Sequence, residues 1–388
     1  MRVVRLLRLR DTGANVLRGA TALLFLAVAA GPMTAQVNPG TTTVGAAATL
    51  ETISLSDADL TGVEGVDLLS VLFAAQADLN PRLRLGISGG FARGVLTRAD
   101  GSEATLSGPT DTRVTLSFPL VDEFVVFSLV GVVPTGNSEQ NGEEAEVANI
   151  VAADLLPFRV SHWGAGGGIG ANIGFARPIC DYGVAVGFGY VVGREYNPVL
   201  NDEFAYRPGD ALTVTAGIDK PVGNEGKATL QASFQRFSDD QVDGRNLYQA
   251  GNRLQVMGTL AFPAGNGNGI AYAGVVHRGG GTIGENPVIT VVGSPSQDLV
   301  LVGGGTRQSL GPGILVPDVS VRLFRRADAV GQGYLGSVGL GYEFRSGRTT
   351  FVPTVRGKMG SVDVQANQTT SLTGFDVGLT VRFGGSRR

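Results

Sequence analysis

Apolar and polar residues alternate along many stretches of this chain. In residues 374–383, "GFDVGLTVRF", every second residue from Phe375 to Phe383 is apolar, and polar or small residues such as Asp376 and Arg382 stand between them. Successive side chains of a β-strand point to opposite faces, so this pattern predicts a strand with one apolar and one polar face.

The same period of two recurs over most of the chain and predicts sixteen strands. If the weaker segments 46–56, 163–176 and 297–306 are not strands, fourteen or twelve strands remain. An even number is expected of an outer-membrane barrel. The sixteen segments are 46–56, 66–79, 82–96, 111–119, 123–134, 163–176, 181–194, 210–220, 227–238, 249–262, 269–280, 297–306, 313–325, 333–345, 348–360 and 371–383.

The connections between these segments alternate in length. Short turns such as 80–81 and 345–348 alternate along the chain with long polar stretches such as 135–148 and 281–296. Short turns on one rim and long loops on the other are typical of membrane barrels. The predicted fold is therefore all-β, a transmembrane antiparallel up-and-down β-barrel of about 12–16 strands, with apolar faces toward lipid and polar faces toward a lumen. Residues 147–160 fit either a loop helix or part of a strand.

The N-terminus indicates export. Five arginines precede the apolar run 20–30, and small residues follow with a cleavage site after Ala35. This order is that of a secretory signal peptide. We therefore predict a signal peptide at 1–35, an N-terminal segment at 36–65 that forms a first strand or a short plug, and an outer-membrane β-barrel at 66–388.

Composition agrees with a barrel and excludes some partners. Charged residues make up 17% of the chain, below the quarter usual in soluble proteins, and no apolar run approaches the roughly 20 residues of a membrane helix. Removal of residues 1–35 takes five of 31 basic and one of 34 acidic residues, which leaves a net charge of −7. This charge argues against a nucleic-acid partner. The single cysteine, Cys180, lies in a predicted turn and rules out an intramolecular disulfide.

Three motifs carry a family resemblance. "NPRLRLGISGGFARG" (80–94), "SGPTDTRVTLSF" (107–118) and "FSLVGVVPTGNSE" (127–139) occur in this order over about 60 residues. They resemble the outer-membrane family named for the meta-pathway of phenol degradation. The resemblance implies a barrel that passes small hydrophobic or aromatic compounds, and it assigns no binding residues. Pro134 and Gly136 are expected to end a strand.

The C-terminal strand carries a second likeness. Phe383 resembles the terminal aromatic residue that the barrel-assembly machinery recognises, although "GGSRR" follows it here. In the motif at 107–118, Gly108 and Asp111 are expected to begin a strand.

Motifs for chemistry are weak, so no catalytic, cofactor or metal residue is assigned and no enzyme is predicted. The chain has no G-x-S-x-G element, and its two histidines are expected in structural roles: His162 in or near a long loop, and His277 inward near the outer rim. The acidic run 137–146 lacks the spacing of an EF-hand and is interpreted as a solvated loop. The glycine clusters 164–174 and 302–307 lack a following helix, so bends and close packing explain them better than a nucleotide.

Charged residues should gather on the lumen side. Arginine or lysine facing lipid at mid-membrane costs about 2–4 kcal/mol, so most must face inward. The alternation places nine basic and five acidic residues inward: Arg82, Arg84, Arg113, Arg253, Arg322, Arg345, Arg356, Lys358 and Arg382, against Asp78, Asp219, Asp318, Glu343 and Asp376. The pore-lining candidates among them are Arg84, Arg113, Arg253, Arg322, Glu343, Arg356, Asp376 and Arg382. A basic pore wall favouring anions and a paired network filling the interior both fit.

The leading hypothesis is a bacterial outer-membrane channel or transporter for passive passage of small molecules, hydrophobic or aromatic on the family resemblance. The alternatives are an anion-preferring diffusion porin and a structural barrel without transport. The expected partners are outer-membrane lipids and lipopolysaccharide, the barrel-assembly machinery and a small-molecule cargo, with no nucleic acid.

Overall fold

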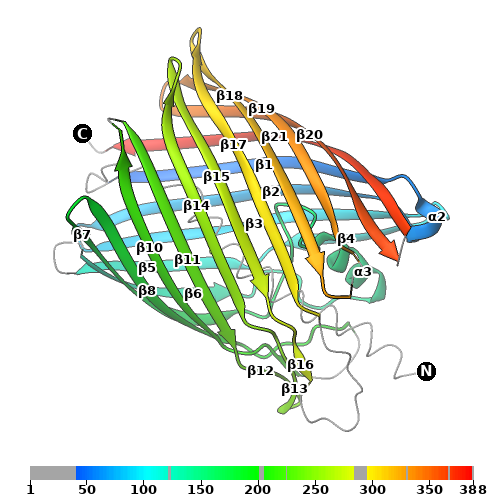
Figure 1. Cartoon of the computed structure of the whole chain (residues 1–388). Helices are drawn as coiled ribbons and strands as arrows, with labels where there is room; N and C mark the ends of the chain where they lie inside the picture. Colours follow the sequence, from blue (N-terminus) through cyan, green and yellow to red (C-terminus); the bar gives the residue numbers. More distant parts are fainter. Residues whose placement is uncertain are drawn as a thin grey trace.

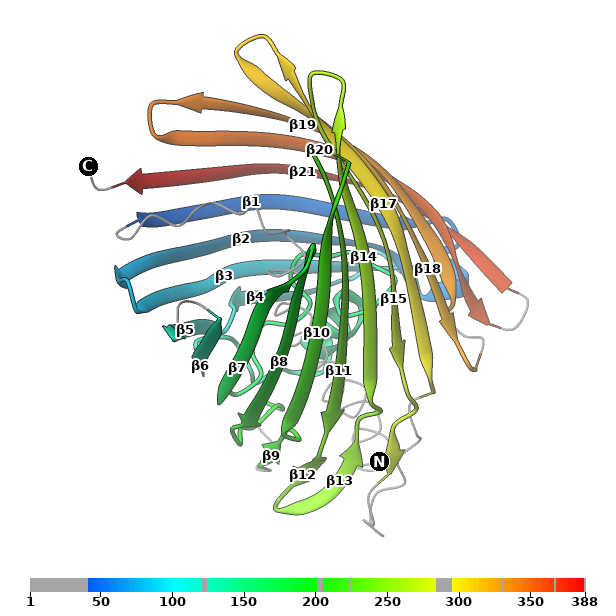
Figure 2. The same cartoon turned by 60° about the vertical axis from the view of Figure 1, so that its left-hand side comes forward.

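The strands close into one barrel. In the computed structural model the described residues are 41–120, 124–200, 205–223, 225–283, 295–328, 331–365 and 368–386. The predicted signal peptide and its cleavage site lie outside them. Within these ranges the chain winds through antiparallel strands around one axis, and β1 (Thr41–Leu55) lies beside β21 (Gln368–Ser386) (Figures 1 and 2).

Sixteen strands form the wall in the described part of the chain, as predicted. Each pairs with the next in sequence, and β1 pairs with β21 to close the ring. Between β1 and β21 they are β2 (Val63–Asn80), β3 (Leu83–Arg98), β5 (Thr112–Leu120), β6 (Val125–Val133), β7 (Gly168–Ile179), β8 (Tyr182–Gly193), β10 (Ala211–Val222), β11 (Gly226–Phe237), β14 (Arg253–Ala264), β15 (Gly267–Arg278), β17 (Gln297–Leu310), β18 (Gly313–Arg326), β19 (Gly333–Ser346) and β20 (Thr349–Gln365).

One wall strand is interrupted. β4 (Glu103–Pro109) pairs with the far end of β3, and β5 pairs with its near end, so β4 and β5 lie along the same edge of β3. The break between them falls at Thr110 and Asp111. The sequence motif at 107–111 therefore marks a discontinuity in the wall as well as the start of β5.

The two rims differ as the loop lengths predict. Turns of a few residues join strands at one rim, for example between β14 and β15, and the paired ends of β1 and β21 lie there too. We call it the short-turn rim, and the opposite one the long-loop rim. At the long-loop rim are helix α2 (Ala58–Thr61), helix α3 (Gly142–Val151) and a small sheet of β9 (Tyr206–Arg207), β12 (Asp239–Val242), β13 (Arg245–Gln249) and β16 (Thr282–Ile283).

The two faces of the wall have opposite character. On β21, Phe375, Val377, Leu379 and Phe383 are exposed on the outside, whereas Asp376 is buried on the inside. The same exposed apolar band continues around the described strands, with Ile169, Val338 and Met359 the most exposed of its members at 66%, 68% and 70%. A soluble protein rarely leaves so large a continuous apolar surface uncovered, so this band is suited to lipid.

Some boundaries differ from the sequence prediction. The segment 36–65, which left open a strand or a plug, contains in its described part the wall strand β1 and the short helix α2. The sixth strand begins at Gly168 instead of residue 163, because Gly166 and Gly167 have φ of +75° and +86°, which a continuous strand does not accommodate. No helix among the described residues is long and apolar enough to cross a membrane.

Candidate channel lumen

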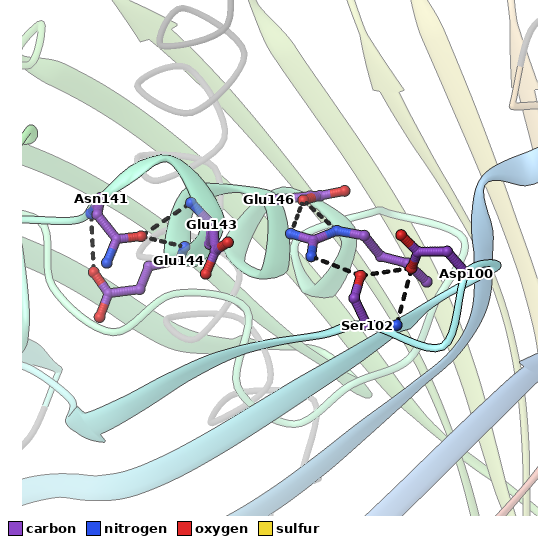
Figure 3. Close-up of polar contacts among 7 residues, drawn as sticks. Asp100, Ser102, Asn141, Glu143, Glu144 and Glu146 are labelled. Atoms are coloured by element: carbon purple, nitrogen blue, oxygen red, sulfur yellow. Dashed lines mark hydrogen bonds and ion pairs between the residues drawn. The ribbon is translucent and has the colours of Figure 1, made fainter.

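The connection between β6 and β7 folds into the barrel, and we call residues 134–167 the inward loop. Its helix α3 begins at Asn141, whose side chain accepts hydrogen bonds from the backbone N–H groups of Glu143 and Glu144 while Glu144 accepts one from the Asn141 N–H (Figure 3). This reciprocal cap fixes the start of the helix. The Arg98 guanidinium at the end of β3 pairs with Glu146 at 2.8 Å and ties the helix to the wall.

This arrangement corrects the interpretation of residues 137–146 as a solvated acidic loop. Glu143 and Glu144 occupy the first turn of α3, where the helix dipole stabilises negative charge, and Glu146 pairs with Arg98. Within the described ranges, no group of three or more histidine, cysteine, aspartate or glutamate residues is placed to hold a metal ion.

Asp111 anchors both ends of the inward loop. Its Oδ1 accepts a hydrogen bond from the Gly136 N–H at 3.0 Å, and its Oδ2 accepts one from the Ala165 N–H at 2.8 Å. The two ends of the loop lie so close together here that a Cβ on Gly136 would clash with the carbonyl oxygen of Trp163. The residues quoted for the family resemblance thus build the base of the loop.

An apolar core fixes the loop against the inner face of the wall. Trp163 is fully buried and donates its indole N–H to the Ala92 carbonyl of β3 at 2.9 Å. Val147 and Val151 of α3 pack on Leu96 and Leu106, which face inward from β3 and β4. Helix α3 therefore lies inside the ring of strands, beside β4 (Figure 1).

The far end of the loop is held by charged groups. The Arg159 N–H donates to the Glu51 carboxylate of β1 at 2.9 Å, and Lys358 of β20 lies over the Phe158 ring at 5.9 Å. Lys358 also pairs with Asp376, and its side chain is only 1% exposed. A buried charge is tolerated only with such partners.

Sequence reasoning placed 147–160 in a loop helix or a strand and did not predict that it enters the lumen. Two signals were available: the stretch is mostly apolar although it belongs to a long loop, and the only tryptophan of the chain follows it. Neither signal reveals which surface of the protein these apolar residues and the tryptophan pack against.

The eight pore-lining candidates face the inside of the barrel but are scattered over several strands. Arg84 pairs with Asp78, Glu343 with Arg307 at 2.9 Å, and Arg356 with Asp318 at 2.8 Å. The barrel brings two of the eight together, since Arg356 also lies 3.9 Å from Asp376. The other four candidates, which form no ion pair among the described residues, are Arg113, Arg253, Arg322 and Arg382.

A cavity of about 1650 Å³ lies between the inward loop and the wall. Arg345 and Arg382 line its end at the short-turn rim, and Gly193 and Ala211 line it where β8 and β10 reach the long-loop rim. Its lining therefore runs along most of the height of the barrel.

The two histidines lie on different sides of the wall. His162 lines the cavity from the loop, and burial, reinforced by the positive charge of Arg113, lowers its pKa to about 4. His277, which the sequence placed inward, faces outward: it stands two residues from the exposed Val275 and its Nδ1 lies 2.7 Å from Asp298 Oδ1. The error was one of register, because a shift of one residue reverses a strand's faces.

Comparisons with known proteins find similarity only to solved structures. No protein-family model matches the chain, and no curated protein matches it in sequence. Among solved structures, the chain is similar to OprB of Pseudomonas putida in its high-pH structure, at 10% identity and a TM-score of 0.49, over 92% of this chain and 97% of that one.

Two further similar structures are an outer membrane channel from Pseudomonas putida F1 and an anion-selective porin from Comamonas acidovorans. The first has 9% identity and a TM-score of 0.39, over 90% of this chain and 97% of that one. The second has 15% identity and a TM-score of 0.38, over 89% and 99%. Values this low assign no family and no function.

Proposed function

We propose that this protein is a channel of the bacterial outer membrane through which small molecules pass without energy input. The observation that carries the proposal is the cavity of about 1650 Å³ inside a closed barrel whose outer face is an apolar band. A barrel of sixteen strands is wide enough for an aqueous passage, and a loop folded against part of the wall narrows it.

Two features bear on the cargo. The cavity wall formed by β6, β7 and β8 carries small or apolar inward residues, among them Val130, Val132 and Gly174. This wall and the motifs shared with the phenol meta-pathway family support small hydrophobic or aromatic compounds.

The arginines support a second candidate, an anion-preferring porin. Arg113 and Arg382 both line the cavity, and neither has an acidic partner among the residues that the structure describes. Unpaired guanidinium groups in a pore wall attract anions. The ion pairs of Arg84, Arg307 and Arg356 instead support a structural barrel without transport, the weaker alternative because the cavity remains beside them.

The location and partners follow from the same proposal. The apolar band would contact outer-membrane lipid, the long-loop rim would face lipopolysaccharide, and the barrel-assembly machinery would recognise the exposed Phe383 on the last strand.

The test is the conductance of the refolded protein in a planar bilayer under a potassium chloride gradient. Stable open steps are expected, with a reversal potential on the anion side if the porin candidate is right and near zero if uncharged cargo is favoured. A correctly folded barrel that never conducts would contradict an aqueous channel and leave the structural alternative.

A further inference from the structure

Two arginines from different strands contact the inward loop at Asp154, and a third arginine lies beside them. Arg278 of β15 donates from Nη1 to Asp154 Oδ2 at 2.9 Å, and its side chain is 8% exposed. Arg322 of β18 donates from Nη1 to the Asp154 backbone carbonyl at 3.5 Å, and Arg253 of β14 is directly opposite Arg278 in the strand register. The Asp154 carboxylate thus pairs with Arg278, while Arg322 contacts the Asp154 backbone and Arg253 lies beside Arg278.

The hydrogen-bonding capacity of this cluster is not used up. The Nε of Arg253 is buried and has no hydrogen-bond partner in the part of the chain that the structure describes. Arg322 forms no ion pair there, and its one hydrogen bond is long. A buried guanidinium without full partners is costly, so a site of this kind favours an additional anion.

The cluster adjoins the cavity. Gln235 of β11 is directly opposite Arg253 in the strand register and lines the cavity. Its Nε2 donates to Thr213 at 3.2 Å, while its Oε1 is buried without a partner among the described residues. A molecule in the cavity therefore reaches Arg253 by passing Gln235.

We propose that Arg253, Arg278 and Arg322 form a site for the carboxylate of a small organic acid, occupied at rest by Asp154 and reached from the cavity past Gln235. The site rests on the proposed channel function and names its cargo class as organic acids whose apolar part lies along the wall of β6, β7 and β8.

The resident group argues for a carboxylate over other anions. Asp154 already presents a planar carboxylate to this cluster, and the planar guanidinium fork matches that shape. The Asp154 side chain is 31% exposed, so it can exchange with an arriving carboxylate without breaking the apolar core around Trp163.

Benzoate is the probe, measured by its block of the potassium chloride current through single channels. In Arg253→Gln the dissociation constant for block is expected to rise about tenfold or more, because a charge-assisted hydrogen bond is lost. In Asp154→Asn it is expected to fall, because the competing carboxylate is gone. Arg236→Gln on β11 is the matched control: Arg236 is exposed on the outer face next to Gln235, and wild-type block is expected.

The outcomes separate the two proposals. No conductance from folded wild-type protein would contradict the channel itself. Normal conductance with equal benzoate block in wild type and Arg253→Gln would overturn the carboxylate site and leave the channel standing. Stronger block by inorganic phosphate than by benzoate would also overturn it, in favour of an inorganic-anion site. If Arg253→Gln fails the heat-shift test of barrel folding on a gel, Arg322→Gln and Asp154→Asn carry the same comparison.

Discussion

The two sides of the lumen are built from different residues. Along β7, β8 and β10 the inward positions are mostly glycine, alanine, asparagine and threonine, for example Gly174, Gly187 and Thr215. Along β18, β20 and β21 they include Asp318, Arg322, Arg356, Lys358 and Asp376. We call these the small-residue side and the charged side.

The difference explains where the cavity lies. The inward loop is held by Glu51, which accepts from its backbone, by Lys358, which lies over its Phe158 ring, and by Arg278, which pairs with its Asp154. The small-residue side offers few such partners, and the cavity runs along it. The ion pairs and hydrogen bonds hold the loop on the charged side, and the small side chains of the opposite side leave the space of the cavity open.

The largest expected effect comes from releasing the loop. Asp111→Ala removes two hydrogen bonds to a carboxylate, each worth about 1.5–3 kcal/mol, so the free energy of unfolding should fall by about 3–6 kcal/mol. Because Trp163 is the only tryptophan, its emission in a urea titration reports on the loop. A red shift in folded barrels together with a larger single-channel conductance is expected. Asp100→Ala, which removes only bonds to Ser102 in an exposed turn, is the control.

Replacing Lys358 by methionine tests the charged side. Its loss leaves Glu51 buried without its cation and leaves Asp376 with only Arg356 at 3.9 Å, which should cost about 3–5 kcal/mol in the free energy of unfolding. The matched control is Lys227→Met, whose pair with Asp219 is about 40% exposed on both partners, so that at most about 1 kcal/mol is expected. Equal losses in the two variants would contradict the contrast between buried and exposed pairs.

Acid should weaken the contact between the loop and the cavity. The pKa of His162 is lowered to about 4 in the folded protein, from 6.5 when unfolded. The unfolded chain therefore binds the proton first, and stability that is full above pH 6.5 declines as the pH falls toward 4, by up to about 3 kcal/mol. Urea titrations at several pH values should show this decline in wild type and lose most of it in His162→Gln. A parallel decline in both proteins would assign it to other groups.

The smallest effect concerns selectivity. Gln231→Arg adds a positive charge to the inner face of β11 beside the small-residue side, where Gln231 lines the cavity. The reversal potential should move modestly toward anion preference, while stability changes little. Gln231→Glu should move it the opposite way. If neither variant changes the reversal potential, ions do not travel along this side.

The sequence alone determined the wall of the barrel. A period of two is imposed on every strand that separates lipid from a lumen, and it appears directly in segments such as 374–383. The alternation within β18, β20 and β21 also indicates which charged residues face inward, because the face of each residue follows from the pattern of its own strand. His277 shows the limit: at a strand end few neighbours remain to fix the parity.

Only the tertiary structure decided what fills the lumen. Whether residues 134–167 extend into solvent or fold inward depends on contacts with Asp111, Glu51 and Ala92, which are 25 to 108 positions away from their partners in the loop. The same holds for Asp154, which contacts Arg278 and Arg322 only because the loop folds inward onto strands that follow it by 124 and 168 positions. Local alternation records which face a residue occupies, and it carries no information about which distant chain segment will lie against that face.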